Sequence, residues 1–211
     1  SYLYTSLMGI EVRVLFVFFI RFPAVHQIDP TKTCLAGDYL HQGNLFGLTA
    51  LTAIDDFSQL EQHRMIYESL VKLTLHEVGH TLGLNHNFYA SHLHSFKNIH
   101  DRLITEPVGL TSSVMDYVTA NVSDSPSHHG QFYSTTPGPY DIWAIEFGYT
   151  PSLESPVDEE ERMEILLSQS TKNELGFGND ADDMRSPGKG IDPRVNVSDM
   201  SNDPVAYAQQ R

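Results

Sequence analysis

The chain has 211 residues, of which 40% are hydrophobic and 19% charged, a balance typical of a globular protein and not of a disordered one. Its formal net charge of −14 argues against nucleic-acid binding, which needs clustered lysine and arginine. The single cysteine, Cys34, excludes an internal disulfide and a cysteine-rich zinc site. The length favours one domain with room for an appendage.

The most apolar stretch of the chain is VRVLFVFFIRF at 12–22. Its β-branched and aromatic residues predict a buried strand at 11–20. Arg13 and Arg21 interrupt the stretch, and it is shorter than the roughly 20 apolar residues that cross a bilayer, so no membrane span is expected. No small-residue cleavage site follows it, which argues against a signal peptide. A short helix is expected near 44–52.

A long helix is predicted from about 57 to 83. Ser58 and Glu61 have the spacing of a capping box, although Asp55 or Asp56 could cap the helix instead. Gly83 is placed to end the helix, because glycine tolerates the left-handed conformation that often closes helices. Apolar residues recur at helical spacing along it: Ile66, Leu70, Val71, Leu73, Leu75, Val78 and Leu82.

The rest of the chain is predicted to be less regular. Residues 87–138 look like loop, 138–149 like a short helix, and 158–169 like a helix with acidic residues in its first turn. The segment from 151 onward holds 13 acidic and 6 basic residues, and its part at 176–202 is expected to be loop. Asp203 and Pro204 mark the start of a last helix, which Arg211 cuts off after about two turns. We therefore expect a fragment of a longer protein.

The stretch HEVGHTLGLNHNF at 76–88 carries the pattern H-E-x-x-H-x-x-G-x-x-H. His76 and His80 are four residues apart, so they lie on one face of the helix and can present two nitrogens to one ion. A continuing helix would carry His86 away from that ion. A sharp turn at Gly83 lets His86 approach, which predicts a zinc site with three histidine ligands.

Glu77 lies beside the predicted ligands and fits the role of a general base better than that of a ligand. It could take a proton from the water that attacks the substrate and pass it to a leaving amine. Zinc lowers the pKa of bound water to about 7, which makes this chemistry possible near neutral pH.

A second motif, SSVMDY at 112–117, follows downstream. Together with the extended histidine motif, it resembles the metzincin clan of zinc endopeptidases. The resemblance implies that Met115 forms a hydrophobic floor beneath the metal ligands. It also implies that Tyr117 matches a tyrosine that coordinates zinc or steadies the tetrahedral intermediate in some metzincins.

The sequence is similar, more narrowly, to long bacterial zinc-dependent metalloproteases that contain domains of unknown function. HEVGHTLGLNHNFYAS, SVMDY, GPYDIWAIEFGY and DPRVN…DPVAYAQQR carry this similarity over about 55–211, and C…GDYLHQ near Cys34 adds to it. The resemblance implies a large region before the zinc helix, a helical region after the present end, and export to the periplasm or beyond. Asn87 departs from better-known metzincins, which place other residues after the third histidine.

Other histidines and acidic residues offer alternatives. His92, His94 and His100 could hold a second metal, with an exposed polar loop as the simpler interpretation. His128 and His129 could line a cleft. The stretch GNDADD at 178–183 offers oxygen ligands for calcium but lacks EF-hand spacing. Asp116 is expected to orient the methionine turn through backbone hydrogen bonds.

These observations predict an α+β, metzincin-like zinc-peptidase domain, truncated and with an incomplete N-terminal sheet. Its catalytic core would occupy 1–150, and 151–211 would form an acidic helix and loop segment. The expected function is zinc-dependent endopeptidase activity on a peptide or protein held in extended form at a sheet edge. A metallohydrolase with a non-peptide substrate and a non-catalytic zinc module remain alternatives. The oligomeric state is open.

Overall fold

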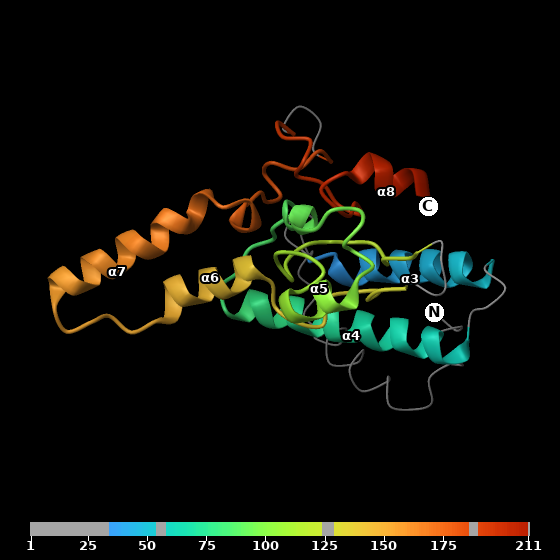
Figure 1. The fold of residues 1–211 in the computed structure, drawn as a ribbon, viewed down its shortest axis with the longest axis horizontal. Coiled ribbons are helices and arrows are strands. Elements are labelled where there is room, and N and C mark those ends of the chain that lie inside the picture. Colours follow the sequence, from blue (N-terminus) through green and yellow to red (C-terminus); the bar gives the residue numbers. More distant parts are fainter. Residues whose placement is uncertain (1–33, 54–57, 124–128, 186–189, 211) are drawn as a thin grey trace, which may run out of the picture. The chain divides into compact units, whose positions relative to one another are not determined.

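The computed structural model describes residues 34–53, 58–123, 129–185 and 190–210 (Figure 1). The chain divides into two compact units, Ser1–Cys34 and Leu35–Arg211, and the second carries all the features described below. The predicted strand at 11–20 lies outside the described residues. The predicted division at residue 150 stays a prediction, and residues 151–210 lie within the second unit.

The second unit is built from helices joined by long irregular segments. The α-helices are α3 (Ala36–Thr52), α4 (Gln59–Thr81), α5 (Arg102–Val108), α6 (Pro139–Tyr149), α7 (Pro156–Ser168) and α8 (Pro204–Gln210). Short 3-10 turns are η2 (Ala90–Leu93), η4 (Gln169–Thr171) and η5 (Asn173–Leu175). The predicted helices at 57–83, 138–149 and 158–169 are confirmed. The short helix predicted near 44–52 is the second half of the longer α3, and α5 was not predicted. None of these helices is long and apolar enough to cross a membrane.

The sheet of the predicted α+β domain is not found among the described residues, which contain no strand. Much of the core is instead irregular backbone, with every residue of 109–123 buried. Side chains bind the backbone there in place of a strand ladder. Glu68 accepts the N–H groups of Phe132 and Tyr133 at 2.6 and 3.2 Å, and the Asn121 amide donates to the carbonyls of Ile99 and Gln131. The predicted substrate-binding sheet edge is therefore absent from the described part of the chain.

Helix α4 begins and ends where the sequence predicts. Ser58 caps it, because its hydroxyl accepts the Glu61 N–H at 3.2 Å. At the other end Gly83 has φ +87°, and the N–H groups of Gly83 and Leu84 donate to the carbonyls of His80 and Gly79, each at 3.0 Å. This pair of bonds is a Schellman motif, which stops the helix and turns the chain.

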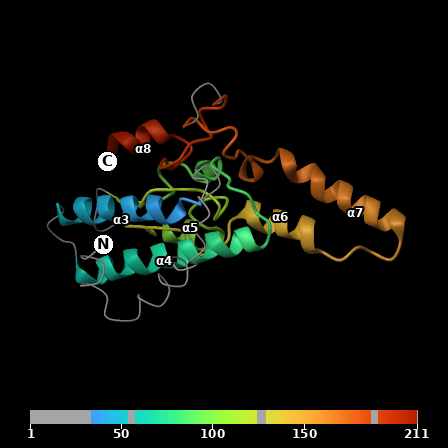
Figure 2. The ribbon, with the colours of Figure 1, turned by 180° about the vertical axis from the view of Figure 1, so that it is seen from behind.

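The buried face of α4 differs from its apolar repeat. The apolar residues mark a helix, yet Val78 and Leu82 at its end are 47% and 40% exposed. Figures 1 and 2 show α3 packed along α4, and the core beside them includes Met65. The buried positions of α4 lie on one helical face, and all but Met65 are polar or small: Met65, Glu68, Ser69, Lys72, His76 and Gly79. Burying these polar groups requires specific partners.

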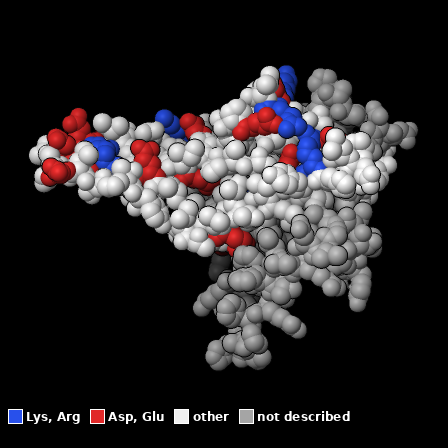
Figure 3. Space-filling view, turned by 90° about the horizontal axis from the view of Figure 1, so that it is seen from below, with Lys and Arg blue, Asp and Glu red and all other residues white. Residues whose placement is uncertain are grey.

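The C-terminal part contacts the core at several points. Helices α6 and α7 contact each other, and η5 contacts both α6 and η2. Figure 3 shows acidic side chains gathered at the α7 end, where Asp158, Glu160 and Glu161 are exposed. These acids form the predicted solvated start of α7. Helix α8 is capped by Asp203, as predicted, and Tyr207 is buried in the core.

Replacing Gly83 by alanine should destabilise the protein by about 1–2 kcal/mol, because a residue with a Cβ is strained at this positive φ. No atom lies within 4 Å of the position of an added Cβ, so the cost comes from the backbone alone. Gly148→Ala, inside α6 and equally open, should instead stabilise by up to about 1 kcal/mol. Urea denaturation measures the stability of both variants. A Gly83→Ala protein as stable as wild type would contradict the requirement for glycine at this turn.

Candidate metal centre

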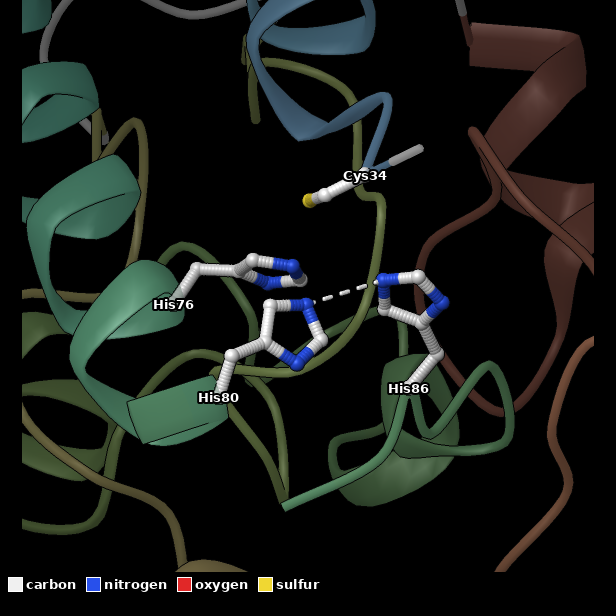
Figure 4. Close-up of side chains that lie close together, drawn as sticks. All are labelled: Cys34, His76, His80 and His86. Carbon is white, nitrogen blue, oxygen red and sulfur yellow. Dashed lines mark hydrogen bonds between the residues drawn. The ribbon is translucent and has the colours of Figure 1, made fainter. Parts of the chain in front are cut away.

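Three histidines converge at the C-terminal end of α4 (Figure 4). His76 and His80 lie one turn apart on the helix, and His86 approaches from the loop that follows Gly83. One ring nitrogen of each lies within 4.8 Å of the others. The structure thus brings together the three histidines that the sequence selected. Cys34, also drawn in Figure 4, ends the first compact unit.

Each of these rings is oriented by a hydrogen bond at its Nδ1. The acceptors are the Val114 carbonyl for His76 at 2.8 Å, the Leu84 carbonyl for His80 at 2.9 Å, and Asp180 Oδ2 for His86 at 2.6 Å. These oxygens have no proton to give, so each Nδ1 carries the hydrogen. In the neutral ring, the Nε2 lone pair is then left for a metal ion.

The distance between two of the ring nitrogens fits a tetrahedral zinc ion. Zinc binds imidazole nitrogen at about 2.0–2.1 Å, so two tetrahedral ligand nitrogens lie about 3.3–3.4 Å apart. The Nε2 atoms of His80 and His86 are 3.2 Å apart. Within the described ranges, this is the one cluster of metal-binding side chains that could hold an ion.

His76 is the most buried of the three, with 1% of its surface exposed. Burial, reinforced by the nearby Lys72 ammonium, lowers the pKa of His76 to about 2. The imidazole is therefore neutral at physiological pH, which is the form that binds metal.

Met115 is fully buried, and its sulfur packs against Gly79 of α4, the residue before His80. A Cβ added at Gly79 would overlap the Met115 sulfur. The glycine inside HEVGH therefore makes room for the methionine. Gly79 was not predicted to have a role, although a glycine in the middle of a helix is unfavourable and so signals a packing requirement.

The turn that carries Met115 is held from two sides. The Val114 carbonyl accepts hydrogen bonds from Lys72 Nζ at 2.5 Å and from His76. Asp141 of α6 accepts from the Ser113 hydroxyl at 2.6 Å and the Val114 N–H at 2.8 Å. Asp116 accepts the backbone N–H of Ser91 at 2.8 Å. Side chains from α4 and α6 thereby fix the backbone next to the histidines.

The charges around this turn are buried together. Burial raises the pKa of Asp141 and, with Asp199 nearby, raises that of Asp116. Burial also lowers the pKa of Lys72 to about 8, although the carboxylates of Asp116 and Asp141 oppose that shift. Removing the lysine would leave two buried acids without their common cation.

Tyr117 is buried with its hydroxyl beside the histidines. The hydroxyl accepts the Leu35 N–H at 2.9 Å and donates to His86 Nε2 at 2.8 Å. Its ring stacks on Tyr39 of α3, with centroids 4.9 Å apart. The hydroxyl therefore adjoins the atom expected to bind metal. Glu77 lies between the two α4 histidines and is half-buried. The roles of Tyr117 and Glu77 stay predictions.

The contacts of two residues at the metal centre, Asn87 and Asp180, were not predicted. Each contact joins residues about 90 positions apart in the sequence. Asn87 is fully buried, and its amide donates to the Gly176 carbonyl while its oxygen accepts the Gly178 N–H. An aspartate at 87 could not donate the first bond, which explains the asparagine. Asp180 belongs to the stretch considered for calcium, and here it binds His86. No local signal in the sequence indicates either contact.

The other histidines do not form a second metal cluster among the described residues. His92 contacts the Arg194 carbonyl at 3.1 Å, and His94 contacts the Gly109 carbonyl at 2.8 Å. The rings of His100 and His129 are 6.5 Å apart. His128 lies outside the described residues. In the calcium candidate, Asp182 accepts the Asn179 N–H and Asp183 pairs with Arg185, so these acids bind protein groups.

Comparison with known proteins gives one match. The sequence model of a family described as Met-zincin matches residues 58–211, which is more than half of the chain. The matched region includes α4, the three histidines, the methionine turn and Asp180. No curated protein and no solved structure gave a match.

Lowering the pH should destabilise the metal-free protein, because the buried His76 must take up a proton. Its pKa falls from 6.5 to about 2 on folding, so between these values the unfolded chain binds more protons. The stability is fully present above pH 6.5 and is lost below it, at about 1.4 kcal/mol per pH unit. Denaturant titrations with a chelator at pH 7 and 5 should show that the free energy of unfolding falls more for wild type than for His76→Gln. Equal falls in the two proteins would contradict this prediction.

Proposed function

Since the chain belongs to the Met-zincin family, we propose that it is a zinc-dependent endopeptidase. The observation that carries the proposal is the convergence of three histidine Nε2 atoms, each ring held at Nδ1 by an oxygen. His76, His80 and His86 would hold the ion and leave a fourth position open, as catalytic zinc sites do. Bound zinc would supply Lewis-acid polarisation and a lowered pKa of water.

The protein's own groups would then carry the proton transfers. Glu77 accepts a proton from the water as its oxygen attacks the carbonyl carbon of the peptide bond. The Tyr117 hydroxyl donates a hydrogen bond to the oxygen that gains negative charge. Glu77 then returns the proton to the amine nitrogen as the carbon–nitrogen bond breaks. Met115 packs against Gly79 of the helix that carries two of the ligands, and the Val114 carbonyl keeps His76 in orientation.

The family suggests a peptidase, and an internal peptide bond of an extended chain is the substrate we propose. Export to the periplasm or beyond belongs to the same proposal and rests on the resemblance alone.

Purified protein should contain about one zinc ion per chain, measured by elemental mass spectrometry. His86→Ala should lose it, because two histidines on one helix bind zinc much more weakly than three converging ligands. His63→Ala is a matched control, since His63 is an exposed histidine on the same helix. Folded wild-type protein that binds no zinc after reconstitution would rule out the metal centre.

Glu77→Gln should keep its zinc and lose about 10²- to 10⁴-fold of its activity, because the amide cannot accept the proton. Casein digestion and a peptide library followed by mass spectrometry measure this, with the exposed Glu160→Gln as control. Equal activity of Glu77→Gln and wild type would contradict the role of Glu77 as general base. Zinc-loaded wild type that cleaves no peptide would favour a non-peptide hydrolase or a non-catalytic zinc module.

A further inference from the structure

The three histidines are not held in the same way. His76 and His80 project from α4, and their Nδ1 atoms bind backbone carbonyls. Figure 4 shows His86 on the loop beyond the helix. Its Nδ1 binds a side chain, Asp180, which lies 94 residues further along the chain. The orientation of His86 therefore depends on a remote segment of the sequence, 176–185.

The carboxylate of Asp180 is held at both oxygens. Oδ2 accepts from His86 at 2.6 Å, and Oδ1 accepts from Arg185 Nη2 at 3.3 Å. Arg185 also pairs with the buried Asp183 at 2.8 Å, and its guanidinium lies 4.9 Å from the centre of the Phe88 ring. Although 57% of the Asp180 side chain is exposed, these contacts define its position.

Hydrogen bonds hold the backbone of segment 176–185 next to His86. Asn87 binds the main chain of Gly176 and Gly178, and the Phe88 N–H donates to the Gly178 carbonyl at 2.7 Å. The two residues that follow His86 thus bind the chain just before Asp180. The histidine and the carboxylate are brought together by main-chain contacts as well as by their own hydrogen bond.

We propose that Asp180 is a positioning residue for the metal centre, and that Arg185 holds it in place. Rings that have lost a proton-accepting partner at Nδ1 can rotate or change tautomer, and a carboxylate there also makes the ring a stronger ligand. Asp180 does for His86 what the helix and the Val114 carbonyl do for His76. This inference rests on the proposed zinc function and assigns part of the centre to the acidic C-terminal segment.

The test measures the zinc dissociation constant by competition with a chromophoric chelator. Asp180→Ala should weaken zinc binding about 10- to 100-fold. Asp180→Asn should lose less, because its amide oxygen still accepts a hydrogen bond. The matched control is Asp182→Asn, which removes the same charge two residues away and should stay within about twofold of wild type.

A second readout does not need zinc. In metal-free protein with ¹⁵N-labelled histidine, NMR should show the Nδ1–H tautomer for His86 in wild type and in Asp182→Asn. Asp180→Ala should move His86 toward the Nε2–H tautomer. Circular dichroism and thermal unfolding of the same metal-free samples check that the variants fold.

Equal zinc affinity of wild type and Asp180→Ala, with no change of tautomer, would overturn the role of Asp180 and leave the proposed function standing. Wild-type protein that binds no zinc would overturn the proposed function and this inference together. If Asp180→Ala unfolds, Asp180→Asn takes its place. A zinc affinity equal to that of Asp182→Asn, together with an unchanged His86 tautomer, would overturn the inference. Weaker zinc binding than in Asp182→Asn would support it.

Discussion

The Val114 carbonyl joins the two motifs that define this protein. It accepts hydrogen bonds from Lys72 and His76, which lie one turn apart on α4, and so ties the histidine helix to the methionine turn. Asp141 completes the arrangement from the other side by binding the Val114 N–H. Because the N–H and the carbonyl of Val114 are both bound by side chains, the irregular backbone around Met115 can be buried without a strand ladder.

This arrangement explains why α4 buries polar residues on the face that an apolar pattern would normally occupy. Glu68 and Lys72 bind main-chain groups of the irregular core, and His76 points to the metal centre. The apolar repeat, including the exposed Val78, was sufficient to predict a helix. It was not sufficient to predict which face is buried, because that face is defined by partners distant in the sequence.

Local signals predicted well whatever depends on neighbouring residues. Ser58 capped α4, Gly83 ended it, and the spacing of the histidines placed three rings together. Contacts between distant segments were beyond such reasoning. Nothing near Asp180 indicates that it binds His86, and the predicted strand at 11–20 lies outside the described ranges.

The bond between His86 and Asp180 also has a thermodynamic consequence. If the segment at 176–185 strengthens metal binding, then metal must stabilise that segment by the same free energy, because such coupling is reciprocal. Asn87 and Phe88 would transmit it, since they bind the backbone of the segment directly. The bound ion would then stabilise the C-terminal part of the fold, and metal binding and the last step of folding would become one cooperative event.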